Sequence, residues 1–233
     1  MFTKMLCHLG FLTPLKRERG EIQKDVKHMP EVEAGGGMDS IKEFIREGPV
    51  HSRNIEIRTF PAEQERVVVE GRLNDERFVC GTRWDGETEA PRTVHRIVVR
   101  LLVGDWPPTI LDAEAEMLDV PHTLCPMTLD SIRNVVGVTI TPGYGKEVQE
   151  RLGGVRGCTH MAHLVGAMGI AVLHGVWTER SRHPRTPPES LEAIPGFSQL
   201  KDSCLLWREG GPIIEEMRAR LKALHNENSQ RGE

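Results

Sequence analysis

The 233-residue chain has few aromatic side chains and little net charge. Aromatic residues make up 5% of the sequence, with a single tyrosine, so they offer no platform on which sugars or bases could stack. The formal net charge is −4. Basic side chains gather only in a short stretch at Lys16, Arg17 and Arg19, which is typical of a solvated surface segment. These shortages argue against a nucleic-acid partner.

Long apolar runs and paired cysteines are missing as well. The longest candidate run, 161–177, is interrupted by glycines and histidines and falls short of the roughly 18 apolar residues that cross a bilayer. An apolar stretch at 5–15 is followed, not preceded, by its basic cluster, which argues against a secretory signal. The five cysteines are odd in number and widely spaced, which argues against a disulfide framework and for a reducing compartment. We therefore expect a cytoplasmic protein without a membrane partner.

Nucleotide-binding motifs are a further absence. Gly143-Tyr144-Gly145 lacks the strand–GxGxxG–helix context of a dinucleotide fingerprint, and it lacks the lysine of a P-loop. The chain also contains no internal repeat. We therefore expect no nucleotide cofactor. The length suits either one larger domain or a core of about 150 residues with extensions.

Composition divides the chain into four regions. Residues 1–48 combine three successive glycines with mixed charges, which is typical of a flexible N-terminal extension. Residues 49–180 carry the regular hydrophobic patterns and are predicted to form the core domain. Four prolines between 184 and 195 predict an irregular connection before a C-terminal helix, both within 181–225. Residues 226–233 are predicted to be a polar tail.

The core region begins with patterns that predict antiparallel strands. Apolar and polar residues alternate in a first pair of segments, which a Pro-containing turn separates. A second pair is rich in β-branched residues and surrounds a Gly-Asp-Trp-Pro-Pro turn. The four strands are expected at 54–60, 66–73, 94–103 and 109–117.

Helical patterns dominate the rest of the core region. Helices are predicted at 127–136 and 146–152, with a short strand at 138–141 between them. From Thr159 to Val176 apolar residues recur at steps of three and four, which predicts a long helix with a buried stripe. The expected fold is therefore α+β, a mostly antiparallel sheet covered by helices. An amphipathic C-terminal helix follows, with apolar residues from Ile213 to Leu224.

Cys158 and His160 are the residues most suggestive of chemistry, because the long helix is predicted to begin between them. Unpaired N–H groups and the macrodipole at a helix N-terminus favour a thiolate, the form that binds metals and attacks electrophiles. Residues two apart do not share a face of a regular helix, so both can reach one ion only if Cys158 is non-helical. A second cysteine, Cys125, precedes another predicted helix, with Pro126 at its first position.

The candidate metal ligands combine two thiols with two imidazoles, and they are His95, Cys125, Cys158 and His160. This mixture suits tetrahedral zinc or an iron site. His122 and Asp112 are alternative ligands. If only three protein ligands bind, the ion could polarise a carbonyl or activate water, with His51, Arg53 or Asp112 on the substrate side.

From about His51 to Trp177 the chain resembles a bacterial domain family without an assigned activity. The resemblance covers roughly half of the chain and implies membership of that family. It rests on four motifs, which are His51-Ser52-Arg53, Glu70-Gly71-Arg72-Leu73-Asn74-Asp75, Asp112-Ala113-Glu114-Ala115 and Arg156-Gly157-Cys158-Thr159-His160.

A more distant resemblance is to the NifU/IscU-type iron–sulfur scaffold domain. The chain is similar to that family in the order of two strands, a cysteine before a helix, and a Cys/His pair that opens a long helix. The resemblance implies an iron–sulfur cluster between strand ends and helix starts, with Cys125 and Cys158 as ligands. It also implies His95 in the place of the scaffold's first cysteine. His160 follows Cys158, whereas the family's histidine precedes its cysteine.

Three functional hypotheses follow. The first is a domain that binds zinc, iron or an iron–sulfur cluster. The second is a metal-free enzyme with Cys158 as the nucleophile, activated by His95 or His122. The third is a non-enzymatic interaction module whose C-terminal helix pairs with itself, as a homo-oligomer, or with a partner protein. The substrate or partner is expected to be a small molecule or a protein.

Overall fold

The main element of the protein is a four-stranded antiparallel sheet. The computed structural model describes residues 40–182 and 186–231. The sheet has the order β1-β2-β5-β6, with strands β1 (His51–Pro61), β2 (Val67–Arg77), β5 (Arg92–Gly104) and β6 (Thr109–Asp119). Both predicted strand pairs are confirmed, and each strand extends beyond its predicted range at one or both ends. The predicted α+β fold is therefore confirmed.

The two faces of the sheet differ because side chains alternate along each strand. Odd-numbered residues of β2 and β5 form the core face, where Val69, Leu73 and Val99 are fully buried. Several even-numbered residues carry charges, such as Glu70, whose Oε2 lies 2.7 Å from Nε of Arg100. An odd-numbered polar residue near a strand end therefore points to the same side as the core.

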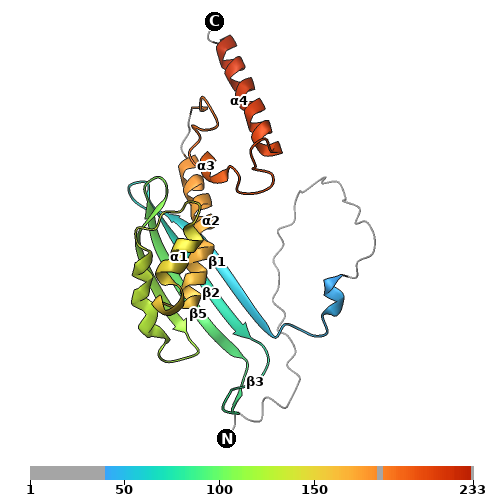
Figure 1. Cartoon of the computed structure of the whole chain (residues 1–233), viewed down its shortest axis with the longest axis vertical. Helices are drawn as coiled ribbons and strands as arrows, with labels where there is room; N and C mark the ends of the chain where they lie inside the picture. Colours follow the sequence, from blue (N-terminus) through green and yellow to red (C-terminus); the bar gives the residue numbers. More distant parts are fainter. Residues whose placement is uncertain (1–39, 183–185, 232–233) are drawn as a thin grey trace. The chain divides into compact units, whose positions relative to one another are not determined.

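Helix α2 (Thr159–Ser181) crosses the core face along β1 and β2 (Figure 1). A Cβ added to Gly71 of β2 would lie 2.7 Å from Sδ of Met168. Farther along the helix, a Cβ added to Gly175 would lie 2.3 Å from Oγ1 of Thr59, close to the hairpin turn. The helix therefore runs toward that turn, and its N-terminus lies at the opposite end of the hairpin.

Between β6 and α2 the chain forms η3 (Cys125–Val135), α1 (Tyr144–Leu152) and η4 (Gly154–Arg156). The helix predicted at 127–136 is a 3₁₀ helix, in which the hydroxyls of Thr128 and Ser131 donate to carbonyls three residues earlier. Such side-chain bonds compete with regular α-helical pairing. The strand predicted at 138–141 is only an isolated bridge between Thr109 and Thr139. The helix predicted at 146–152 is confirmed as α1.

The C-terminal segment has a small core of its own, formed by α3 (Phe197–Leu200), α4 (Pro212–Arg231) and their connections. Three buried residues form this core, namely Leu191, Phe197 and Ile214, with Trp207, Met217 and Leu221 packed against them. The predicted C-terminal helix is confirmed, and it continues to Arg231, beyond its last apolar residue. Ile214 is the buried residue of its apolar face, Met217 and Leu221 are half-buried, and Leu224 is 37% exposed.

Contacts divide the described residues into two compact units. The larger unit holds 53–76 and everything from 93 onward. The smaller unit holds 77–92 and the described residues before 53. It contains η2 (Ile41–Phe44) and a two-stranded ladder, β3 (Gly81–Thr82) with β4 (Thr88–Glu89), which no sequence pattern predicted. Most of the predicted extension, 1–48, lies outside the described residues.

By length and composition alone, α2 could cross a membrane, and among the described helices it alone meets that test. The core helix of a water-soluble domain can have the same length and composition. Here Met161, Leu164, Val165 and Met168 of α2 belong to the main hydrophobic core.

Candidate functional site

Three polar side chains interrupt the apolar core face at one end of the sheet. They are Arg53 near the start of β1, Asp75 near the end of β2, and His95 near the start of β5. Each occupies an odd-numbered position and so points to the helix-covered side. Because β2 lies between β1 and β5 in an antiparallel sheet, these three strand ends meet. Strand order therefore gathers a guanidinium, a carboxylate and an imidazole.

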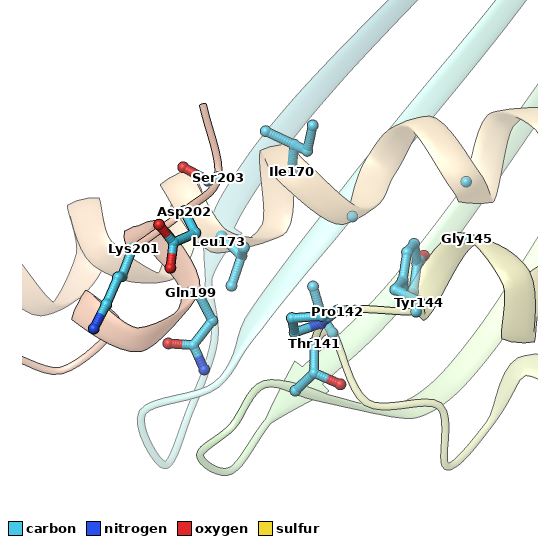
Figure 2. Close-up of a pocket in the computed structure, with 14 residues that line it drawn as sticks. Thr141, Pro142, Tyr144, Gly145, Ile170, Leu173, Gln199, Lys201, Asp202 and Ser203 are labelled. Carbon is cyan, nitrogen blue, oxygen red and sulfur yellow. The ribbon is translucent and has the colours of Figure 1, made fainter. Parts of the chain in front are cut away.

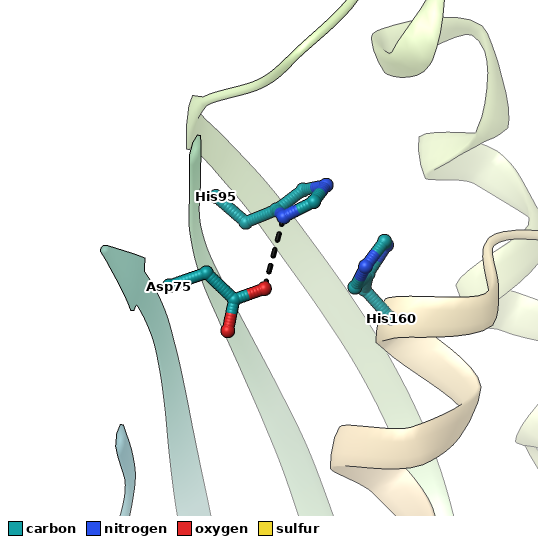
Figure 3. A group of neighbouring side chains, drawn as sticks. All are labelled: Asp75, His95 and His160. Atoms are coloured by element: carbon teal, nitrogen blue, oxygen red, sulfur yellow. Dashed lines mark hydrogen bonds and ion pairs between the residues drawn. The ribbon is translucent and has the colours of Figure 1, made fainter. Parts of the chain in front are cut away.

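Asp75 is the centre of the group. Arg53 donates from Nε to Oδ1 at 2.7 Å and from Nη2 to Oδ2 at 2.6 Å. On the other side, Nδ1 of His95 lies 2.9 Å from Oδ2 (Figure 3). The Asp75 side chain is 2% exposed, compared with 12% for His95 and 35% for Arg53. A buried carboxylate is thus held by partners on both neighbouring strands.

Asp75 is ionised at neutral pH. Burial alone would raise the pKa of this carboxyl, but hydrogen bonds from Arg53 and His95, together with the charge of Arg53, lower it below its ordinary value. The same pair raises the pKa of Arg53. An ionised carboxylate can only accept hydrogen bonds, so Nδ1 of His95 is the donor. Asp75 therefore orients the guanidinium and selects the position of the proton on His95.

The start of α2 supplies the remaining side chains. Cys158 precedes the helix in an extended conformation, with φ −94° and ψ 126°, and the helix begins at Thr159. The condition that Cys158 be non-helical is therefore met. Its Sγ lies 3.9 Å from Nδ1 of His160.

His160 lies against His95, with ring centroids 3.7 Å apart and planes inclined by 33°. Burial lowers the pKa of His160, and the nearby His95 and Arg53 lower it further, against the opposing effect of Asp75. His160 is therefore neutral at pH 7. One candidate ligand atom from each of Asp75, His95 and His160 lies within 4.8 Å of the other two. Two imidazoles and a carboxylate are a donor set that divalent transition metals accept.

The structure brings together two of the four predicted metal ligands, His95 and His160. Cys158 lies beside His160, but it does not belong to the group of ligand atoms within 4.8 Å. Cys125 begins η3, which packs against β6 and α1, and it is also outside that group. Cys125 and Cys158 are free thiols, whereas Cys80 is disulfide-bonded, which the odd number and wide spacing of the cysteines did not predict.

The other predicted candidates are placed as follows. Arg53 joins the group through Asp75. His51 is the exposed first residue of β1, and His122 is exposed in the connection before η3. Asp112 is exposed and pairs with Arg133, with 3.3 Å between Oδ1 and Nη1.

Sequence reasoning did not select Asp75 as a site residue, although hairpin register could have found it. At the turn, the N–H of Ala62 donates to the carbonyl of Arg66. Counting outward from that pair places Arg53 opposite Asp75. Opposite charges at directly facing positions interact, so the register was the available signal.

A separate groove of about 600 Å³ lies between the start of α1, the exposed side of α2 and the segment after α3 (Figure 2). Tyr144, Ile170 and Leu173 make it largely apolar. Lys201 lies at its edge, but its Nζ is 2.6 Å from a carboxylate oxygen of Glu209. Of the described residues that line this groove, none belongs to the Asp75–His95–His160 group.

Comparison with protein families gives one match. Residues 51–174, more than half of the chain, match the family model described as Protein of unknown function, DUF2889. The matched range contains every residue of the group described above. No curated protein and no solved structure matches the chain.

Proposed function

The chain belongs to the DUF2889 family, and we propose that its domain binds a divalent transition-metal ion, zinc or iron, through Asp75, His95 and His160. The observation that carries the proposal is the convergence of their ligand atoms within 4.8 Å. Two strands and a helix supply these atoms. Asp75 is buried and the histidines are half-buried, unlike the exposed acidic groups that commonly gather without an ion.

The donor set favours a site with an open coordination position. Three protein ligands leave a position for water or substrate at catalytic zinc, and two histidines with one carboxylate are also the facial triad of non-haem iron(II) enzymes. An ion with an open position can polarise a carbonyl or activate water. The sequence predicted a ligand set of two sulfur and two nitrogen atoms, whereas the geometry favours a ligand set of two nitrogen atoms and one oxygen atom.

The contact between Asp75 and His95 fits two ligands of one ion as well as it fits a hydrogen bond. Two atoms bound at right angles with bonds of about 2.1 Å lie about 3 Å apart. Oδ2 and Nδ1 lie 2.9 Å apart. Binding would then replace the Nδ1 proton, since metal ligands must be deprotonated. Arg53 would still donate a hydrogen bond to Oδ1 of Asp75, which keeps the carboxylate in place.

A specific observation favours a second candidate function, thiol chemistry at Cys158. Its sulfur lies at the N-terminus of α2, 3.9 Å from a ring nitrogen of His160. His160 in turn lies against His95, which Asp75 orients. A nucleophile, an adjacent base and a third group that positions the base are the usual parts of nucleophilic catalysis. The geometry favours His160 as the activating imidazole, where the sequence suggested His95 or His122.

The other predictions from the sequence have less support. An iron–sulfur scaffold like NifU/IscU would need several thiolates in one place, and Cys125 does not join the group around His160. We therefore propose a single ion instead of a cluster. For an interaction module, the C-terminal helix was the expected surface; Ile214 on its apolar face is buried by the same chain, whereas Leu224 is exposed, and pairing of this helix stays a prediction. A cytoplasmic location stays a prediction.

Metal analysis of the full chain tests the proposal. The protein is purified anaerobically without chelator, its zinc and iron are measured, and the metal-free form is titrated with cobalt(II) while visible absorption is recorded. We expect about one ion per wild-type chain, and metal affinity at least about tenfold lower after His95→Ala or His160→Ala. Asp75→Asn should also weaken binding, because an amide replaces the anionic ligand.

His163→Ala is the matched control, because His163 is an exposed histidine one turn after His160 on the same helix. It should bind metal like the wild type. Cys158→Ser should also retain the ion. Loss of the ion in that variant, or a sulfur-to-cobalt charge-transfer band in the wild type, would make the thiolate a ligand. Metal binding unchanged by both His95→Ala and His160→Ala would overturn the proposal.

A further inference from the structure

We propose that Arg53 binds a small-molecule oxyanion, a carboxylate or phosphate group, at the open position of the metal. The inference rests on the metal-binding function proposed above and names the class of its ligand. Two observations carry it: the charge balance of the group, and the part of the Arg53 guanidinium that Asp75 does not use.

The charge balance calls for an anion. Arg53 and Asp75 form an ion pair and neutralise each other, and histidines that bind a metal are neutral. A divalent ion then adds two positive charges beside a buried carboxylate whose own charge is already balanced. Cys158, even as a thiolate, would cancel only one of them. Charges in a half-buried place are normally paired, so a negatively charged ligand stabilises the loaded site.

The geometry of Arg53 provides the second contact for that ligand. A guanidinium carries five N–H groups in a planar fork. Asp75 takes one from Nε and one from Nη2. Within the described residues no acceptor lies at Nη1, and 35% of the side chain is exposed. The Nη1 edge can therefore receive a second oxyanion while Asp75 holds the plane of the guanidinium.

Arg53 is also fixed close to the proposed ion. Its Nη2 lies 2.6 Å from Oδ2 of Asp75, the oxygen that we assign to the metal. A ligand with two oxygens on one atom can thus place one oxygen on the ion and the other on the guanidinium. The planar fork of arginine suits such groups, whereas the point charge of lysine does not reproduce two parallel hydrogen bonds.

Anion binding to the cobalt-loaded full chain tests the inference. Acetate and inorganic phosphate are titrated separately, with chloride as a monatomic control, and the visible spectrum reports occupation of the open position. We expect acetate or phosphate to bind the wild type at least about tenfold more tightly than chloride. Comparison of the two probes distinguishes a carboxylate ligand from a phosphate ligand.

Two substitutions of Arg53 and one control locate the second contact. Arg53→Gln should weaken binding of the preferred oxyanion at least about tenfold, and Arg53→Lys should weaken it less, since lysine keeps the charge and loses the fork. Arg58→Gln is the matched control on the same strand. Its guanidinium pairs with Glu56 and is more than half exposed, so oxyanion binding should not change. The cobalt affinity of each variant is measured in the same series.

The outcomes separate this inference from the proposed function. If cobalt binds through His95 and His160 but acetate and phosphate bind no better than chloride, the inference alone fails. It also fails if both Arg53 variants bind cobalt and the oxyanion like the wild type. If cobalt does not bind the wild type, the proposed function fails and the inference falls with it. Arg53→Lys keeps the test decisive if Arg53→Gln does not fold.

Discussion

Arg53 binds both carboxylate oxygens of Asp75 across the β1–β2 hairpin, with Nε 2.7 Å from Oδ1 and Nη2 2.6 Å from Oδ2. The two residues are 22 positions apart in the sequence. Their pairing positions Asp75 for His95 on the next strand, and His95 in turn lies against His160 of α2. One ion pair therefore organises side chains from three strands and a helix, and it matters for stability as well as for the proposed chemistry.

Removal of Arg53 should destabilise the metal-free protein more than neutralisation of Asp75. Arg53→Ala leaves a buried carboxylate without its main counter-charge, which we expect to lower the free energy of unfolding by about 3 kcal/mol. Asp75→Asn leaves a neutral amide that still accepts one hydrogen bond, so a loss of about 1–2 kcal/mol is expected. Urea unfolding at pH 7 with chelator measures both. Arg58→Ala, whose ion pair is exposed, should change stability by less than about 0.5 kcal/mol. The reverse order of Arg53→Ala and Asp75→Asn would contradict this account.

Stability of the metal-free protein should fall as the pH decreases below about 6.5, and His160 should contribute to the fall. Burial, with the nearby His95 and Arg53, lowers the pKa of His160 below its ordinary value of 6.5. The unfolded chain therefore takes up this proton at a higher pH than the folded protein does. The contribution of His160 to the free energy of unfolding is fully present above pH 6.5. It is lost as the pH falls through the pKa of His160 in the folded protein. Urea unfolding at pH 8 and pH 5.5 should show a smaller decrease for His160→Gln than for the wild type. His122→Gln is the control, because His122 is exposed and is not among the residues that shift the pKa of His160. If the free energy of unfolding decreases as much in His160→Gln as in the wild type, burial does not lower the pKa of His160 as described.

Two glycines of α2 should respond oppositely to alanine. A Cβ on Gly169 would lie 2.5 Å from Cε1 of Tyr144, a buried ring whose hydroxyl donates to the Val165 carbonyl. The hydrogen bond to Val165 holds the ring beside Gly169, so Gly169→Ala should destabilise the protein by about 1–3 kcal/mol. A Cβ on Gly166 would meet nothing within 4 Å. Gly166→Ala should therefore stabilise it by up to about 1 kcal/mol through helix propensity. Thermal melting measures both, and equal melting temperatures would show that α1 and α2 are not packed as described.

Cys158 should react with iodoacetamide faster than Cys125 in the metal-free protein. Both thiols are partly buried, but only Cys158 combines a helix N-terminus with an imidazole at 3.9 Å. The neutral imidazole can accept the thiol proton as the sulfur attacks iodoacetamide. His160→Gln should slow the reaction at Cys158 and leave Cys125 unchanged. Mass spectrometry of timed samples gives each rate, with the exposed Cys204 as a reference for full access. Equal rates at Cys125 and Cys158 would remove the support for thiol chemistry.

Local patterns were enough to predict the secondary structure around the site. Alternation identified the four long strands, and steps of three and four identified α2, because each pattern reflects a face that neighbours in the chain share. The 3₁₀ geometry of η3, in which the hydroxyls of Thr128 and Ser131 donate to carbonyls three residues earlier, was not predicted from the apolar spacing. The small ladder of β3 and β4 was missed because two-residue strands carry no periodic signal.

Residue type and local pattern were enough to select four of the residues, since His95, His160, Cys158 and Arg53 all lie in or beside the group. Their side-chain chemistry and the predicted start of α2 are local properties that can be read along the chain. Hairpin register places Asp75 opposite Arg53, but the folded chain alone brings His95 and His160 to Asp75 and leaves Cys125 outside the group. This grouping depends on strand order and register, which set the contacts between residues distant in the sequence. Hydrogen bonds between strands and the packing of α2 on Gly71 determine those contacts, and neither is encoded in the spacing of any one segment.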